Sequence, residues 1–131
     1  GGPTTCVYAL SSGASDILSA LRAGHSFITF APNGPTLRLS AGDAIMGDSL
    51  PWAAAPELHI QAEGLLAGDV LRVVTAASAE AVFKAPQDGS LALTLPVPAP
   101  GFARVEVLRA FLPGLPMLPA ALSNPVYFDG A

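Results

Sequence analysis

Proline and glycine divide this chain into short pieces, and this division limits its fold more than any other feature of the sequence. The 131 residues include 13 prolines and 13 glycines, which interrupt the apolar runs. A helix that spans a membrane needs roughly 20 consecutive apolar residues, and the long helices of a bundle do not tolerate internal prolines. Both classes are therefore excluded, and many short elements joined by turns are expected.

Between the turns, apolar and polar side chains alternate with a period of two. In residues 57–63, for example, Leu58 and Ile60 alternate with His59 and Gln61. Such alternation, with one polar face, is typical of antiparallel strands. Strands are expected in these segments: residues 4–10, 26–30, 36–40, 57–63, 69–75, 81–85, 90–95 and 102–108. A turn and a terminal strand are expected within residues 122–128. The pattern predicts a mainly β protein, an antiparallel, immunoglobulin-like β-sandwich of about seven to nine strands.

Glycines indicate the end of one helix and the position of one turn. Apolar residues at helical spacing predict a single short helix over residues 15–23, which Gly24 ends in the left-handed conformation. Asp88 and Gly89 are typical of a tight hairpin turn, because both tolerate a positive φ. Two serines are candidates for the N-cap of the helix: Ser12 and Ser15.

Charges are few and scattered along the chain. Six Lys and Arg residues against ten Asp and Glu residues give a formal net charge of −4. Nucleic acids and anionic membrane surfaces bind clustered cations, so neither is expected as a partner. Cys6 is the single cysteine, which excludes an internal disulfide and leaves the redox compartment open. The first residues lack the pattern of a signal peptide, which slightly favours the cytoplasm.

No set of residues has the spacing of an active site or a metal site. The two histidines, His25 and His59, are expected at the surface, with His25 beside the negative end of the helix. Asp43 and Asp48 flank a short loop. They are expected to cap its turns rather than bind Ca²⁺, because the spacing of a calcium loop is absent. No catalytic residue and no metal or cofactor site is therefore assigned.

Three further features have a structural and a functional interpretation. Cys6 lies in an apolar strand and is expected to be an unreactive core thiol. Trp52 is expected to anchor packing, and the alternative is a platform on which a ligand stacks. Arg104 and Glu106 are expected on the exposed face of one strand, where they form a weak ion pair or contact a neighbouring domain.

The segment of residues 111–119 is almost entirely apolar, yet three prolines interrupt it. Proline cannot donate to a β-ladder, so this segment is not expected to form a central strand. It is expected to lie extended over the sandwich, and the chain then closes with a turn and a terminal strand.

The order of several short motifs resembles a known family. Residues 4–8, 17–29 and 34–35 are similar to the end of the catalytic domain in PHP-domain (polymerase and histidinol phosphatase) metal-dependent phosphoesterases. His25 stands where that family usually has arginine. Later segments are similar to a β-sandwich that one branch of the family appends: residues 45–48, 102–107 and 123–127.

The resemblance implies a domain without catalytic residues of its own. The family's metal-binding motifs, including an early H-x-H and a late D-x-H, are absent from this chain. Residues 1–34 are then the end of a PHP domain, and residues 35–131 are a C-terminal accessory sandwich. Its expected partner is the PHP catalytic domain of the same polypeptide, which holds the divalent metals. The alternative is a free-standing sandwich that binds a carbohydrate or a peptide.

An accessory domain that docks on a catalytic domain is expected to expose an apolar face when it is alone. Patches of several hundred Å² are unusual on monomers and indicate interfaces, and such a face would also allow self-association. The alternative is that the proline-rich run covers an open sheet edge and is buried. The candidate interface consists of Val7, Tyr8, Phe111, Leu112, Leu115, Met117 and Leu118.

Overall fold

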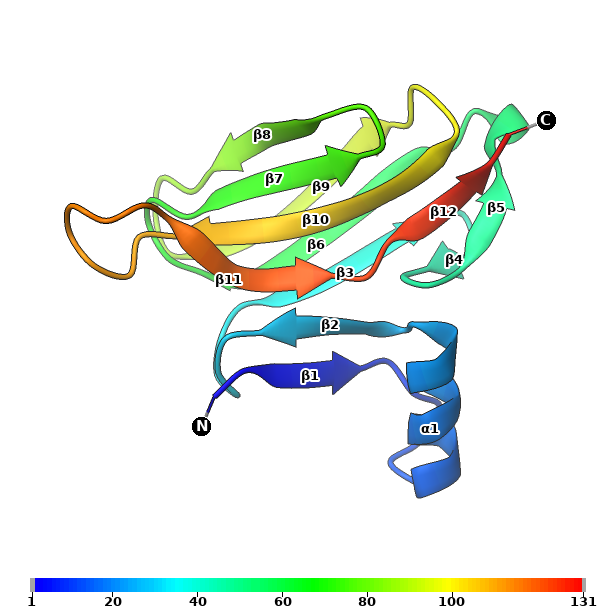
Figure 1. Cartoon of the computed structure of the whole chain (residues 1–131), viewed down its shortest axis with the longest axis horizontal. Coiled ribbons are helices and arrows are strands. Elements are labelled where there is room, and N and C mark those ends of the chain that lie inside the picture. The colour runs from blue at the N-terminus through cyan, green and yellow to red at the C-terminus, as the bar shows by residue number, and fades with distance from the viewer. Residues whose placement is uncertain (1, 131) are drawn as a thin grey trace.

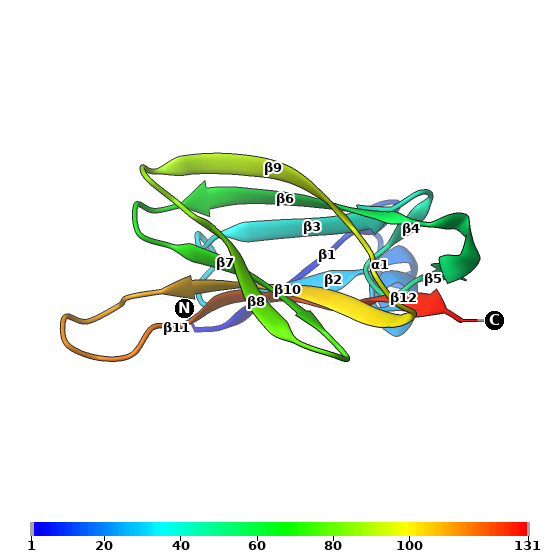
Figure 2. The same ribbon diagram turned by 90° about the horizontal axis from the view of Figure 1, so that it is seen from above.

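A computed structural model describes residues 2–130, and its strands form two sheets that lie face to face (Figure 2). The mainly β sandwich expected from the sequence is confirmed, and its immunoglobulin-like topology stays a prediction. The large sheet contains β1 (Thr4–Val7), β2 (Ser26–Thr29), β5 (Ser49–Pro51), β7 (Val70–Thr75), β8 (Ala79–Lys84), β10 (Gly101–Arg109), β11 (Leu118–Ser123) and β12 (Val126–Asp129). The small sheet contains β3 (Thr36–Ala41), β4 (Ala44–Ile45), β6 (Glu57–Leu65) and β9 (Gly89–Pro96).

Strand β10 lies in the middle of the large sheet (Figure 1). One edge of β10 pairs with β7 from Ala103 to Leu108, and the other edge pairs with β11 and β12. β2 pairs with β11, and β1 pairs with β2, so the N-terminal strands extend the same sheet. These pairs are antiparallel, whereas β5 pairs with β12 in parallel.

The hydrophobic core fills the layer between the two sheets. On the small sheet, alternate side chains of β3 and β6 are almost inaccessible, among them Leu37, Leu39 and Ile60. On the large sheet, Val105 and Val107 of β10 are fully buried. One face of each strand therefore contributes to the core, which is why the period-two alternation predicted these strands.

The α-helix of the described chain, α1 (Ala14–Ala23), agrees with the expected range. Gly24 ends it in the left-handed conformation, with a φ of 76°. The expected cap by Ser12 or Ser15 is wrong, because the N-cap position is Gly13 and no side chain caps the helix. A short 3-10 helix, η1 (Trp52–Ala54), follows β5.

Three short strands were not expected from the sequence: β4, β5 and β11. The expectation that residues 111–119 stay outside a central strand is wrong at their end, because β11 includes Pro119 and lies between β2 and β10. A bulge makes this possible, since the register with β10 shifts between Val107 and Leu108. Proline is tolerated at strand starts and bulges, where the ladder does not need its missing N–H.

The hairpin expected at Asp88 and Gly89 is also wrong. β8 pairs with β7 in the large sheet, and β9 pairs with β6 in the small sheet. The residues between β8 and β9 therefore connect the two sheets. The Asp88 carboxylate accepts a hydrogen bond of 2.8 Å from the N–H of Ala67 instead. Local turn chemistry indicates a turn, but not which strands the turn joins.

Gly47 lies where two segments approach too closely for a side chain. Its φ is 91°, and a Cβ there would lie 2.0 Å from the carbonyl oxygen of Ala23 and 2.8 Å from the Cα of Gly24. Its N–H also donates to the carbonyl of Pro125 at 2.6 Å. This glycine therefore holds the end of α1 against the connection between β11 and β12.

We expect Gly47→Ala to lower the free energy of unfolding by about 3 kcal/mol or more, because backbone rather than flexible side chains must move. Gly68→Ala is the matched control. Its φ is 90°, but nothing lies within 4 Å of the added Cβ, so only a conformational cost of about 1 kcal/mol is expected. Urea unfolding measures both losses, and equal losses would contradict the close approach at Gly47.

Candidate functional site

On each strand of the large sheet, the residues that alternate with the buried ones point away from the core and form the outer face. On β10 these residues alternate with the buried Val105. Figure 1 views this face, and no other element of residues 2–130 covers its centre. The strand register defines one row of side chains across it. Ile28 of β2 lies beside Leu122 of β11, Leu122 beside Glu106 of β10, and Glu106 beside Arg72 of β7.

Apolar side chains form much of this outer face. Ile28 is 47% exposed, and Leu122 beside it is half-buried. Tyr127 is exposed and lies opposite the half-buried Phe102 on the neighbouring strand. Single exposed apolar residues are normal on a protein surface, but groups of them on one uncovered face indicate an interaction surface.

A charged cluster interrupts the apolar face at its centre. Glu106 is only 5% exposed. Arg72 Nε donates to its Oε2 at 2.9 Å, and Arg104 Nη1 donates to its Oε1 at 2.6 Å. The expectation that Arg104 and Glu106 form a weak, exposed pair is therefore wrong for Glu106, because the adjacent strands place Arg72 and Leu122 on either side of it.

Burial alone would raise the pKa of the Glu106 carboxyl, because the charged form loses hydration. Hydrogen bonds from Arg104 and Arg72, together with their positive charges, outweigh burial, so the pKa of Glu106 lies below its usual value. The carboxylate is therefore charged at neutral pH. The two arginines and the one glutamate leave the centre of the outer face with an excess of positive charge.

The apolar loop between β10 and β11 projects beyond the end of the sandwich (Figures 1 and 2). Leu112 is 60% exposed and Leu115 is 58% exposed. The alternative in which this run is buried over a sheet edge is therefore wrong. The loop packs against the residue that follows β2, because the Phe111 ring meets the Phe30 ring edge-on, with ring centres 5.0 Å apart. The candidate residues of this loop are exposed, apart from half-buried Met117: Phe111, Leu112, Leu115, Met117 and Leu118.

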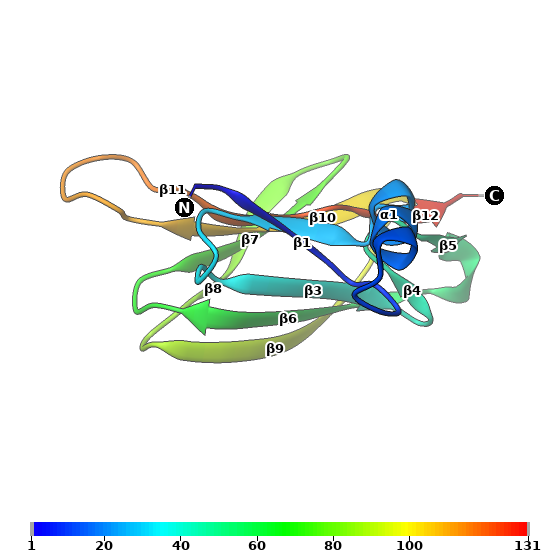
Figure 3. The same cartoon turned by 90° about the horizontal axis from the view of Figure 1, so that it is seen from below.

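The other two candidate interface residues are Val7, the last residue of β1, and Tyr8, which follows it. β1 ends on the side of α1, whereas the loop projects from the opposite end of the sandwich (Figures 1 and 3). Val7 is half-buried on the outermost strand. The Tyr8 hydroxyl donates to the carbonyl of Leu37 at 2.7 Å, and the Arg38 guanidinium lies 5.1 Å from the Tyr8 ring centre. Burial raises the pKa of Tyr8. The structure therefore does not bring Val7 and Tyr8 together with the loop.

His25 is half-buried and pairs with Asp48, a partner that the sequence did not indicate. Its Nε2 lies 2.7 Å from Asp48 Oδ1, and Asp48 Oδ2 accepts a hydrogen bond of 3.0 Å from the Ile45 N–H, so Asp48 caps a turn as expected. Burial alone would raise the pKa of Asp48, but the hydrogen bonds from Ile45 and His25 lower it. His59 is exposed, as expected, with Nδ1 3.0 Å from Thr94 Oγ1.

The remaining residues considered from the sequence are Cys6, Trp52 and Asp43, which pack against the core or lie in a turn. Cys6 is half-buried and packs against the core. Trp52 also packs against the core and donates its indole N–H to the carbonyl of Val97 at 2.9 Å. Its ring therefore acts as a packing anchor, as expected. Asp43 is exposed in the turn between β3 and β4.

Three features were looked for and not found: a metal-binding group or a membrane-spanning helix in the described part of the chain, and a match to a known protein. Within residues 2–130, no three His, Cys, Asp or Glu side chains lie close enough together to hold a metal ion. The helices of the same residues are too short or too polar to cross a membrane. In comparisons with known proteins, no family model, curated protein or solved structure matches the chain.

We expect Glu106→Gln to lower the free energy of unfolding at pH 7 by about 1–3 kcal/mol, because three hydrogen bonds from Arg72 and Arg104 lose their charged acceptor and the two arginines are left close together. The folded pKa of Glu106 is lowered, so its stabilising effect is complete above the unfolded pKa of about 4.3 and disappears as the pH falls through the folded value.

Urea unfolding at pH 7 and at pH 3 measures this effect. The difference between the wild type and Glu106→Gln is expected to shrink at the lower pH. Glu57→Gln, at an exposed position on β6, is the control and is expected to change stability little at either pH. A difference that stays constant with pH would show that the charge of Glu106 does not stabilise the fold.

Proposed function

We propose that this chain is a non-catalytic accessory domain that docks onto the catalytic domain of a PHP-type metal-dependent phosphoesterase in the same polypeptide. The observation that supports the docking role is the uncovered outer face of the large sheet, where Ile28 and Tyr127 are exposed around a charged centre. The family itself rests on the order of motifs in the sequence.

The composition of the outer face suits such a contact. Interfaces combine an apolar area with a few polar groups, and arginine and aromatic residues are enriched in them. Here Arg72 and Arg104 are about one-third exposed and are already oriented by Glu106. The oriented guanidinium groups lose little further side-chain freedom on binding, which reduces the cost of association. They favour a partner surface with acceptor or acidic groups opposite the centre of the face.

The projecting loop between β10 and β11, residues 110–117, adds a second exposed apolar region at the end of the large sheet. It continues the β10–β11 pair beyond the sheet (Figure 1). Leu112 and Leu115 of the loop are exposed, and so is Leu118, which begins β11. Alone, such a surface also favours self-association. The alternative function is a free-standing domain that binds a carbohydrate or a peptide. Carbohydrate binding has less support, because the Trp52 ring is held in packing and is not an open stacking platform.

The first test is the sequence encoded upstream of this chain, which we expect to contain a catalytic domain with H-x-H and D-x-H motifs. That domain and this chain, prepared separately, are then expected to associate when mixed. Isothermal titration calorimetry measures the affinity. Ile28→Glu places a charge on the outer face at an exposed position, so it is expected to weaken binding about tenfold or more and to leave folding intact.

Gln61→Glu is the matched control, because it introduces the same charge at an exposed position on the outer side of the small sheet. It is expected to bind like the wild type. Circular dichroism checks that both variants fold. The proposal fails if no such domain is encoded upstream, or if the Ile28 and Gln61 variants bind equally well.

A further inference from the structure

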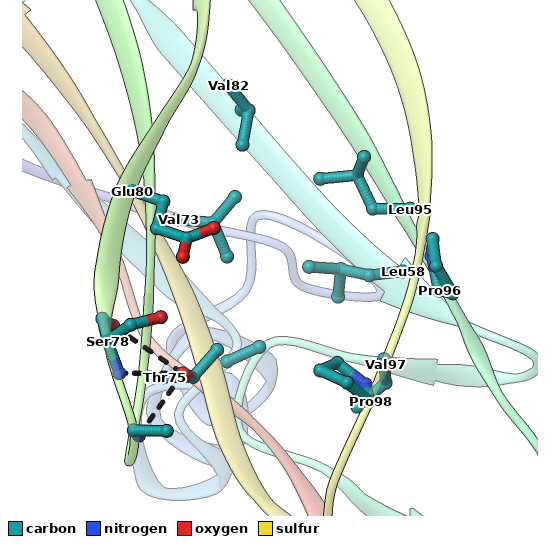
Figure 4. Close-up of a pocket in the computed structure, with 12 residues that line it drawn as sticks. Leu58, Val73, Thr75, Ser78, Glu80, Val82, Leu95, Pro96, Val97 and Pro98 are labelled. Carbon is teal, nitrogen blue, oxygen red and sulfur yellow. Dashed lines mark hydrogen bonds between the residues drawn. The ribbon is translucent and has the colours of Figure 1, made fainter.

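A pocket of about 320 Å³ opens between the two sheets, on the side where β8 and β9 form their edges (Figure 4). Its walls come from both sheets. Leu58 and Leu95 belong to the small sheet, and Val73, Val82 and Ala103 belong to the large sheet. A pocket of this volume with a mainly apolar lining is within the range of small-molecule sites.

One carboxylate, that of Glu80, faces this apolar space. Glu80 lies opposite Val73 in the β7–β8 register, and Val73 lies beside the fully buried Val105. Register partners project to the same side of a sheet, so Glu80 leaves β8 on the inner face of the large sheet, at the solvent-exposed edge of the layer between the sheets. Figure 4 shows its carboxylate directed toward Leu58 and Leu95 on the opposite wall.

The charge of Glu80 has no cation beside it within residues 2–130. The ion pairs of these residues use the carboxylates of Asp48, Asp69 and Glu106 instead. Thr75 at the rim is engaged within its own turn, because its Oγ1 accepts hydrogen bonds from the N–H groups of Ala77 and Ser78. Among the residues that line the pocket, Glu80 therefore provides a charged group that can bind a ligand.

We propose that this pocket binds an apolar small molecule that carries one ammonium group. The apolar part lies between Leu58, Leu95 and Val82, and the ammonium group pairs with the Glu80 carboxylate at the mouth. Burial of apolar area provides the affinity, and the single carboxylate selects a cation over a neutral or anionic ligand of the same shape. This site is separate from the outer face and does not depend on the docking role.

A carboxylate that points inward on an edge strand has a second use, because it discourages edge-to-edge pairing between molecules. Edge protection requires no apolar pocket next to the carboxylate and no preference for a ligand. Binding and its charge dependence therefore distinguish the two roles of Glu80.

The chain contains its own reporter for this pocket. Its single tryptophan, Trp52, donates its indole N–H to the carbonyl of Val97, which lines the pocket. A ligand against Val97 changes the surroundings of this hydrogen bond. We therefore expect the fluorescence of Trp52 to respond to occupancy, and calorimetry provides an independent measurement.

The probes are n-octylamine, n-octanol and octanoate, which share one chain and differ in charge. We expect saturable binding of one octylamine per chain, and weaker binding of octanol and octanoate. Glu80→Gln is expected to weaken octylamine binding about fivefold and to leave octanol binding unchanged. Val82→Phe fills the pocket and is expected to abolish binding of both.

Glu63→Gln, at an exposed position on β6, is the matched control and is expected to bind octylamine like the wild type. Thermal unfolding shows whether each variant is folded, and Glu80→Gln removes only an exposed charge. The proposal is overturned if octylamine does not bind saturably, if octanol or octanoate binds as well as the amine, or if Glu80→Gln and Glu63→Gln behave alike.

Discussion

The pairing of β10 with three other strands is the interaction on which the rest of the structure depends. β7 occupies one edge of β10, and β11 and β12 share the other. The two faces of β10 have different chemistry. Val105 and Val107 complete the core between the sheets, whereas Arg104 and Glu106 form the charged centre of the outer face. One strand therefore determines both the stability of the sandwich and the character of its exposed surface.

At its C-terminal end, β10 also connects the two sheets. Arg109 donates to Asp69 at 2.7 Å and to the carbonyl of Gly64 in β6 at 3.2 Å, and Asp69 is almost fully buried. Two charges are costly to bury unless they are paired and hydrogen-bonded. Here the Asp69 carboxylate also accepts a hydrogen bond from the N–H of Leu66. The β6–β7 turn, which crosses between the sheets, is held in place by this pair.

Alternation within a segment predicted most of the strands, because it depends only on which face of a strand meets the core. It did not predict strand neighbours, which depend on residues far away in the sequence. Glu106 alternates with buried valines and was expected to be exposed, yet Arg72 and Leu122 flank it on other strands. Pro119 is a second example. In the sequence it argued against an internal strand at this position, but a bulge in the pairing of β11 with β10 accommodates the proline. The Glu80 pocket was missed because β8 alternates weakly and its register with β7 is shifted.

The sheet order has a consequence for the synthesis of this chain. β2 pairs with β11, and Ser26 accepts a hydrogen bond from Asn124, 98 positions later. At a translation rate of about 5–20 residues per second, β2 waits on the order of ten seconds before its partner strand exists. During that interval Ile28 and Phe27 have no sheet to join on that side. Long-range pairing of this kind is slow to form and leaves apolar strands available for aggregation. The β11-facing edge of β2 therefore stays unpaired until the last strands of the chain are made.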